Sequence, residues 1–197
     1  MIAALYVDAR GPYIGIDGVD PWTEERDARL YAGPHAVVAH PPCAPWSRLK
    51  HMCRRDPEGQ RSCFAPALAA VRRWGGVLEH PAASSAFRAF GVPLPGELPD
   101  AWGGISIEVA QVEWGHVARK LTWLYLVGVA ADVAMRRPPF PGRQPTHWCN
   151  GGRHRVDGGG GIVPDGIKVA SAQQRRRTPP LFRDWLVTMA RHSKVTR

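Results

Sequence analysis

The sequence predicts an α/β fold, with a Rossmann-like, mostly parallel sheet flanked by helices. Three observations lead to this prediction. Short apolar segments typical of buried strands recur along the chain, segments with apolar residues at helical spacing lie between some of them, and Pro or Gly separates the two kinds. Strands that alternate with helices favour parallel pairing. A length of 197 residues suits one domain, or one domain with a small extension.

Four segments are predicted to be strands because they are short, apolar and rich in β-branched or aromatic residues. Pro41 and Pro42 close the second of them, and the third also ends in a proline. A weaker alternation over 105–115 favours a further extended segment. The four predicted strands are residues 2–7, 35–40, 76–81 and 122–130.

Two helices are predicted from strong amphipathic patterns. The first pattern covers 63–74, and Gly75 ends it. The second covers 178–193, which starts with a Thr and two prolines and carries its large apolar residues on one stripe. The weaker signals predict helices at 21–31 and 83–91 and loops at 47–60 and 91–104.

The composition changes after the fourth strand. Residues 136–168 are dense in Pro, Gly and Arg and show no periodicity, which is typical of a functional or disordered loop. We therefore expect an α/β catalytic-like domain over 1–135 and a basic Gly/Pro-rich segment over 136–177. The last part, 178–197, is expected to be a C-terminal helix that packs on the domain.

The charge of the chain indicates a polyanionic partner. Lys and Arg number 26 against 17 Asp and Glu, which gives a formal charge of +9 and a pI near 10.0. DNA is the simplest such partner, although a solvated basic surface would have the same composition. No apolar run reaches the roughly 18 residues of a membrane span, so no membrane partner is expected. The four cysteines come without other signs of secretion, and the N-terminus has no basic head, so we expect reduced thiols and a cytoplasmic location.

Reactive side chains lie near the ends of three predicted strands. Cys43 follows the second strand, Glu79 lies in the third, and Arg119 and Lys120 come just before the fourth. Ligands of such sheets bind beyond the carboxyl ends of the strands. A thiol, a carboxyl group and two cations at one edge would make a site for covalent catalysis. The alternatives are a buried structural cysteine, a capping or surface carboxylate and a solvated basic face.

These residues also carry a resemblance to a known family. "PPCAPWS" resembles the Pro-Pro-Cys motif of DNA cytosine-C5 methyltransferases, and "LEHP" is similar to their Glu-Asn-Val motif, which phage-type members often write Glu-Asn-Pro. "QVEWGHVARKLTWLYLVG" is similar to their Gln-x-Arg-x-Arg block. The three motifs occur in the family's order, and the resemblance covers roughly residues 37–130.

The resemblance implies a role for each matching residue. Cys43 would attack C6 of a cytosine flipped out of the duplex, and Glu79 would hold the base at N3 and at its amino group. Arg119, together with Lys120, would contact the base O2 or a nearby phosphate. Further expected contacts to substrate or DNA are Pro42, Ser47, His80, Gln111, His116 and the basic triplet Arg175, Arg176 and Arg177.

The chain departs from the family before Cys43. Family members place their S-adenosylmethionine site there, opened by a Phe-x-Gly-x-Gly-Gly turn, and this chain has no such turn. Only 40 residues precede Pro41, and a βα unit takes about 30 or more. Asp8, Asp17 and Asp20 are the acids available to a shortened cofactor pocket, with solvated turn residues as the alternative reading. We expect S-adenosylmethionine binding to be weak or absent, and the one-carbon donor stays open.

Three functional hypotheses follow. The chain is an enzyme that modifies cytosine at C5 through a Cys43 adduct, a non-catalytic DNA-binding relative that lost the donor site, or an enzyme acting on free pyrimidine nucleotides. No metal is expected, because the His and Cys residues show neither CxxC nor HxxxH spacing.

Overall fold

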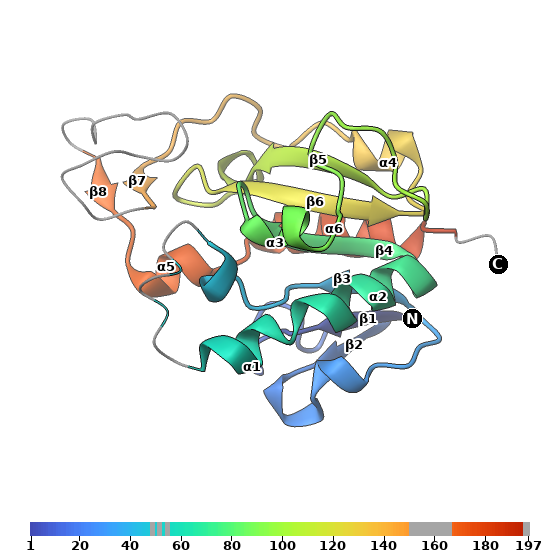
Figure 1. Cartoon of the computed structure of the whole chain (residues 1–197). Helices are drawn as coiled ribbons and strands as arrows, with labels where there is room; N and C mark the ends of the chain where they lie inside the picture. Colours follow the sequence, from blue (N-terminus) through green and yellow to red (C-terminus); the bar gives the residue numbers. More distant parts are fainter. Residues whose placement is uncertain (48–49, 51–52, 54–55, 150–166, 195–197) are drawn as a thin grey trace.

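A six-stranded sheet forms the centre of the molecule in the computed structural model, which describes all residues except 48–49, 51–52, 54–55, 150–166 and 195–197 (Figure 1). The strand order is β2-β1-β3-β4-β6-β5. β6 is antiparallel to both of its neighbours, and the other three pairs are parallel. The strands are β1 (Ile2–Leu5), β2 (Val19–Trp22), β3 (Ala36–Ala39), β4 (Gly76–Pro81), β5 (Ile105–Ala110) and β6 (Leu121–Val127).

Helices cover both faces of this sheet, so the predicted α/β class is confirmed and the arrangement is compatible with a Rossmann-like fold (Figure 1). α2 (Phe64–Trp74) packs on one face and α6 (Pro180–Arg191) on the other. Alternate residues of a strand point to opposite faces. Val77 of β4 accordingly lies in the core on the α6 side, and Leu78 lies in the core on the α2 side. Burial of one such side chain stabilises the fold by about 1.5–3 kcal/mol.

The remaining helices are short. They are α1 (Pro57–Arg61), α3 (Ser85–Ala89), α4 (Ala131–Ala134) and α5 (Ala172–Arg176). A separate two-stranded sheet pairs β7 (His147–Trp148) with β8 (Lys168–Val169). None of the described helices has the length and apolar character that crossing a membrane requires.

A loop rather than a helix connects the parallel strands β1 and β2. Residues 6–18 cross the α6 side of the sheet, and Tyr13 is buried there at 2% exposure among the side chains of α6. Two arginines of α6 hold the loop by its backbone. Arg183 donates to the Pro12 carbonyl at 2.6 Å, and Arg191 donates to the Asp17 carbonyl at 2.6 Å.

The predicted helix over 21–31 is wrong. Its first residues belong to β2, and two 3-10 turns, Glu24–Arg26 and Ala28–Leu30, follow. Asp27 separates the turns with φ at +42°, which a continuous helix does not allow. The edge strand was missed because Val19–Trp22 has too few apolar residues to form a periodic pattern.

Other boundaries also differ from the prediction. The first and fourth strands are shorter than predicted, because Tyr6 and Gly128 take positive φ angles of +60° and +69° after them. The extended segment 105–115 is a strand only to Ala110 and continues as a 3-10 turn over Gln111–Trp114. The expected loop 47–60 contains the start of α1, and the expected irregular segment 136–177 contains α5, β7 and β8, while 150–166 lies outside the described residues.

Candidate functional site

The strand order brings four chain segments to one edge of the sheet. β3, β4 and β5 run in the same direction, and β6 starts at the edge where they end. His40 and Cys43 therefore follow β3, Glu79 lies near the end of β4, Gln111 follows β5, and Lys120 precedes β6. These residues come from segments up to 80 positions apart in sequence, and the topology alone makes them neighbours.

Glu79 is the centre of a buried hydrogen-bond chain. Its side chain is 12% exposed, its Oε2 accepts from Nδ1 of His40 at 3.0 Å, and its Oε1 accepts from the amide of Gln111 at 3.2 Å. Burial alone would raise the pKa of this carboxyl group. The hydrogen bond from His40 and the positive charge of Lys120 outweigh that effect and lower its pKa to about 2. Glu79 is therefore an ionised hydrogen-bond acceptor that is largely buried from solvent.

Tyr13 extends the chain on the far side of His40. Its hydroxyl lies 2.7 Å from Nε2 of His40, and the two rings are in contact with their centroids 5.3 Å apart. Burial and the negative charge of Glu79 raise the pKa of Tyr13 well above its ordinary value, so it stays protonated. Sequence reasoning missed Tyr13, because nothing in a Gly-rich loop indicates that one aromatic residue turns inward.

Gln111 joins Glu79 to β6. Its amide nitrogen also donates to Oγ1 of Thr122 at 2.9 Å, and that hydroxyl donates onward to the Lys120 carbonyl at 3.2 Å. Gln111 is 1% exposed, and its Oε1 has no hydrogen-bond partner within the described part of the chain. An unpaired buried acceptor costs free energy, and a donor on a ligand would remove that cost.

Cys43 begins a 3-10 turn and is exposed to solvent. Its carbonyl accepts the backbone N–H groups of Trp46 and Ser47 at 3.0 and 2.9 Å, which fixes the turn. Desolvation of the thiol by the surrounding atoms and the negative charge of Glu79 raise the pKa of Cys43. Lys120 and Arg176 act in the opposite direction but do not cancel this effect. The resting side chain is therefore a thiol, not a thiolate.

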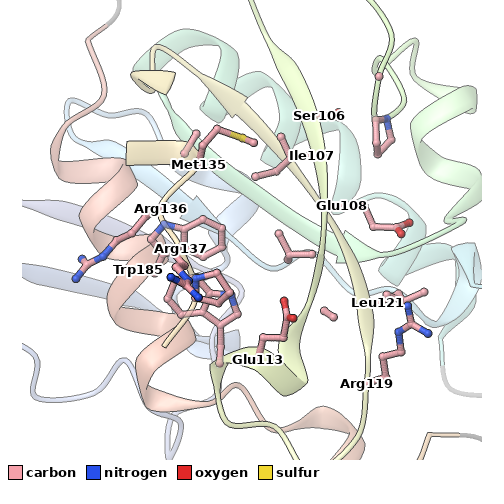
Figure 2. Close-up of a pocket in the computed structure, with 17 residues that line it drawn as sticks. Ser106, Ile107, Glu108, Glu113, Arg119, Leu121, Met135, Arg136, Arg137 and Trp185 are labelled. Atoms are coloured by element: carbon pink, nitrogen blue, oxygen red, sulfur yellow. The ribbon is translucent and has the colours of Figure 1, made fainter. Parts of the chain in front are cut away.

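The two adjacent cations of the predicted site serve different places. The positive charge of Lys120 lowers the pKa values of Glu79 and Cys43. The backbone φ of Lys120 is +36°, and its Nζ lies 3.5 Å from the Arg177 carbonyl. Arg119 instead lines an open groove of about 610 Å³ beside β5 (Figure 2). The electrostatic interaction with Cys43 and Glu79 comes from Lys120, while Arg119 faces the groove.

The groove beside β5 collects positive charge. Figure 2 shows Arg119 next to Leu121 on one side and Arg136 and Arg137 on the other. All three arginines are exposed, and none has an ion-pair partner among the described residues. The two carboxylates of the groove already accept hydrogen bonds: Glu108 from the Trp123 indole at 2.9 Å, and Glu113 from the Gly142 N–H at 2.8 Å.

Two histidines expected at the substrate are instead buried in the protein. His80 is 0% exposed and points to the α2 side of the sheet, where it contacts Phe64 and lies 2.7 Å from Oγ of Ser84. His116 is 3% exposed, and its Nε2 lies 2.9 Å from the Gln174 carbonyl. Burial lowers the pKa of both, to about 4 for His80. His80 thereby contacts the residue that caps α3, Ser84, and His116 contacts α5 at the Gln174 carbonyl.

The other predicted contacts have mixed positions. Pro42 and Ser47 are half-buried beside Cys43, and the Ser47 hydroxyl donates to the Ala44 carbonyl at 3.2 Å. In the basic triplet, the positive charge of Arg176 lowers the pKa of Cys43, whereas Arg175 donates a hydrogen bond to the Ala170 carbonyl at 3.0 Å.

Two of the three acids proposed for a cofactor pocket, Asp8 and Asp20, accept hydrogen bonds from residues close to them in sequence. Asp8 accepts the Arg10 N–H at 2.8 Å, and Asp20 accepts from Arg26 and from the Trp22 indole. Asp17 is exposed. The described residues contain no group of three or more His, Cys, Asp or Glu side chains that could hold a metal ion.

Comparisons of the chain with protein-family models, with curated proteins and with solved structures found no match. The fold and the site together define an α/β protein that presents an exposed cysteine beside a buried, ionised glutamate at the carboxyl edge of its parallel strands.

Proposed function

We propose that this chain binds a cytosine of DNA and adds the Cys43 thiol to C6 of the base. The observation that carries the proposal is the position of Cys43 beside an ionised Glu79 at a cationic edge of the sheet. Cys43 and Glu79 are also the side chains that lie in the two motifs resembling those of DNA cytosine-C5 methyltransferases.

The reaction uses groups that the chain itself provides. The thiol proton leaves to solvent, which the exposed Cys43 contacts, and the sulfur forms a bond to C6 while the C5=C6 electron pair moves onto C5 and into the ring. A solvent proton then adds to C5. Loss of a C5 proton restores the double bond and expels the thiolate, so the cycle closes without an external donor.

The residues of the N-terminal loop do not fit a nucleotide-like methyl donor. Tyr13 is buried beyond the end of β1, and Asp8 and Asp20 are already hydrogen-bonded within their loops. The loop offers no Gly-rich turn at a helix N-terminus. We therefore include no methyl-transfer step in the proposal.

DNA is favoured over a free nucleotide by the groove beside β5. Lys120 at the site is followed in space by its chain neighbour Arg119, and the groove continues to Arg136 and Arg137. Unpaired arginines arranged in this way suit successive phosphates of one strand.

A hydrolase with a Cys-His-Glu triad is disfavoured. In such a triad one imidazole nitrogen faces the nucleophile and the other faces the carboxylate. Both nitrogens of His40 are engaged here, by Glu79 and by Tyr13.

The second candidate function is DNA binding without catalysis. The raised pKa of Cys43 favours it, because a thiol is a much weaker nucleophile than a thiolate.

The test is hydrogen exchange at C5 of cytosine. DNA is incubated with the protein in D2O, and its nucleosides are analysed by mass spectrometry for the gain of one deuterium. We expect exchange with the native chain and with Cys63→Ala, a control at a half-buried cysteine, and none with Cys43→Ala. Exchange that persists in Cys43→Ala would overturn the adduct. DNA binding without exchange would support the second candidate, and the absence of both would reject both.

A further inference from the structure

The hydrogen-bond chain from Tyr13 to Glu79 has a defined direction. An ionised carboxylate only accepts hydrogen bonds, so Nδ1 of His40 must carry the proton that lies between His40 and Glu79. The Tyr13 hydroxyl can donate to Nε2 of His40 in the tautomer that carries its proton on Nδ1. The hydrogen bond at one ring nitrogen thereby selects the tautomer that serves the other.

Two donors of this hydrogen-bond chain, His40 and Gln111, meet on the carboxylate of Glu79. His40 donates to Oε2 of Glu79, and the amide nitrogen of Gln111 donates to Oε1. Because the same nitrogen also donates to Thr122, the Gln111 amide can be oriented in only one way. A carboxylate held at both oxygens has one orientation, and its remaining lone pairs have fixed directions. Such preorganisation is what a ligand-binding acceptor needs.

We propose that Tyr13 and His40 are positioning residues: Tyr13 fixes the tautomer of His40, and the hydrogen bond from His40 holds Glu79 oriented toward the base. The proposal rests on the proposed function and gives Glu79 a role in it, because an ionised carboxylate can accept a hydrogen bond from the amino group of the bound cytosine. It also gives the loop between β1 and β2 a role, because this loop brings Tyr13 to the site in place of a cofactor-binding turn.

The charged and titratable groups around the pair come from every element that packs there. Glu79 and His80 lie on β4, and Lys120 precedes β6. On α6, the charge of Arg183 lowers the pKa of Tyr13 and the charge of Asp184 raises it. Within the described part of the chain, the side chains that donate hydrogen bonds to Glu79 are His40 and Gln111. Loss of the His40 donor removes the largest effect that opposes the burial of Glu79 and leaves the charge of Lys120 and the hydrogen bond from Gln111, so the carboxyl group should take up a proton at higher pH than in the native chain.

Two substitutions of His40 separate its two hydrogen bonds. In His40→Asn the amide nitrogen can replace Nδ1 and still donate to Glu79, whereas in His40→Gln the amide reaches the place of Nε2 beside Tyr13. Tyr13→Phe removes one oxygen atom and leaves the ring in the core. Tyr31→Phe is the matched control. Tyr31 is also hydrogen-bonded, to the backbone of His35, but it does not belong to the series of hydrogen bonds that leads from Tyr13 to Glu79.

The readout is the NMR carboxyl resonance of Glu79 in protein labelled with 13C at the glutamate side chains. The resonance is assigned by its loss in Glu79→Gln. It is followed from pH 7 down to pH 4.5, which is the ordinary pKa of a glutamate. We expect no titration in the native chain, in Tyr31→Phe or in His40→Asn. His40→Gln should titrate within this range, and Tyr13→Phe should move in the same direction by less. The proposal is overturned if Glu79 stays ionised in both His40→Gln and Tyr13→Phe, or if His40→Asn and His40→Gln behave alike. The measurement needs no reaction at Cys43, so its failure is distinct from a failure of the C5 exchange test.

Discussion

Arg119 and Lys120 are consecutive in the chain, yet the charge of Lys120 lowers the pKa values of Cys43 and Glu79, whereas Arg119 lines the groove beside β5. The left-handed backbone of Lys120, with φ at +36°, accompanies this divergence just before β6 begins. One cation therefore tunes the reactive groups, and its neighbour is available to a ligand outside the site.

Removal of the Lys120 charge should make Cys43 less reactive. Lys120 lowers the pKa of the thiol, so Lys120→Gln should raise it further and reduce the thiolate fraction at neutral pH. We expect alkylation of Cys43 by iodoacetamide to slow by about 2- to 10-fold, which corresponds to a pKa change of up to about one unit. Peptide mapping by mass spectrometry separates Cys43 from the other cysteines, and Lys168→Gln, at an exposed lysine of β8, is the control. An unchanged rate at Cys43 would show that Lys120 does not act on the thiol.

Binding to DNA should depend on salt, and the arginines of the groove should carry part of that dependence. Each phosphate contact contributes about −0.9 to the slope of log affinity against log salt. Replacement of Arg119, Arg136 and Arg137 by Gln should therefore make the slope shallower by up to about 2.7. The control variant Arg26→Gln/Arg29→Gln removes two exposed arginines that are already paired with Asp20 and Asp27. Equal slopes for the two variants would remove the groove from the DNA interface.

The same reasoning extends to the basic triplet beside the site. Replacement of Arg175, Arg176 and Arg177 by Gln should weaken binding to all DNA sequences alike, because phosphate contacts carry no sequence information. Filter-binding with several unrelated duplexes measures this effect. A loss confined to one sequence would indicate base contacts instead.

The protein should lose stability as the pH falls from about 6.5 to about 4. Burial lowers the pKa of His80 from 6.5 to about 4 in the folded chain, so the unfolded chain binds more protons between these values. The free energy of unfolding therefore decreases with falling pH, by about 3 kcal/mol at most from this residue. His80→Gln should flatten the dependence in urea unfolding experiments. His192→Gln, at the exposed end of α6, should leave it unchanged. A native profile that is flat over this range would contradict the buried neutral state of His80.

S-adenosylmethionine should not bind measurably to this chain. Isothermal titration calorimetry should give no saturable heat with the native chain, because the loop between β1 and β2 is packed against α6. Saturable binding that Tyr13→Phe or Asp20→Asn alters would show that this loop does form a donor pocket.

The sequence supported part of the site because strand ends can be recognised locally. Cys43 directly follows an apolar segment that prolines close, Glu79 lies within one that ends in proline, and parallel strands place such residues at one edge. The participation of Tyr13 depends on how a loop packs against a helix about 170 residues later, and no local pattern records that. The separation of Arg119 from Lys120 depends on one backbone angle.

Some of the missed elements did have local signals. α5 begins with a capping box in which Ser171 accepts the Gln174 N–H and the Gln174 side chain accepts the Ser171 N–H. Ser-x-x-Gln at this point of the sequence predicts a helix start, although the segment around it is rich in arginine. β2 had no comparable signal, because its four residues are only half-buried at the edge of the sheet.

The anchoring of the 6–18 loop by α6 has a consequence for biosynthesis. Arg183 and Arg191 leave the ribosome long after the strands that carry Cys43 and Glu79. A nascent chain that already contains β1 to β6 has no support for Tyr13, and hence none for His40. The thiol is thus translated early, whereas the contacts that hold the loop of Tyr13 form only after residues 180–191 have been synthesised.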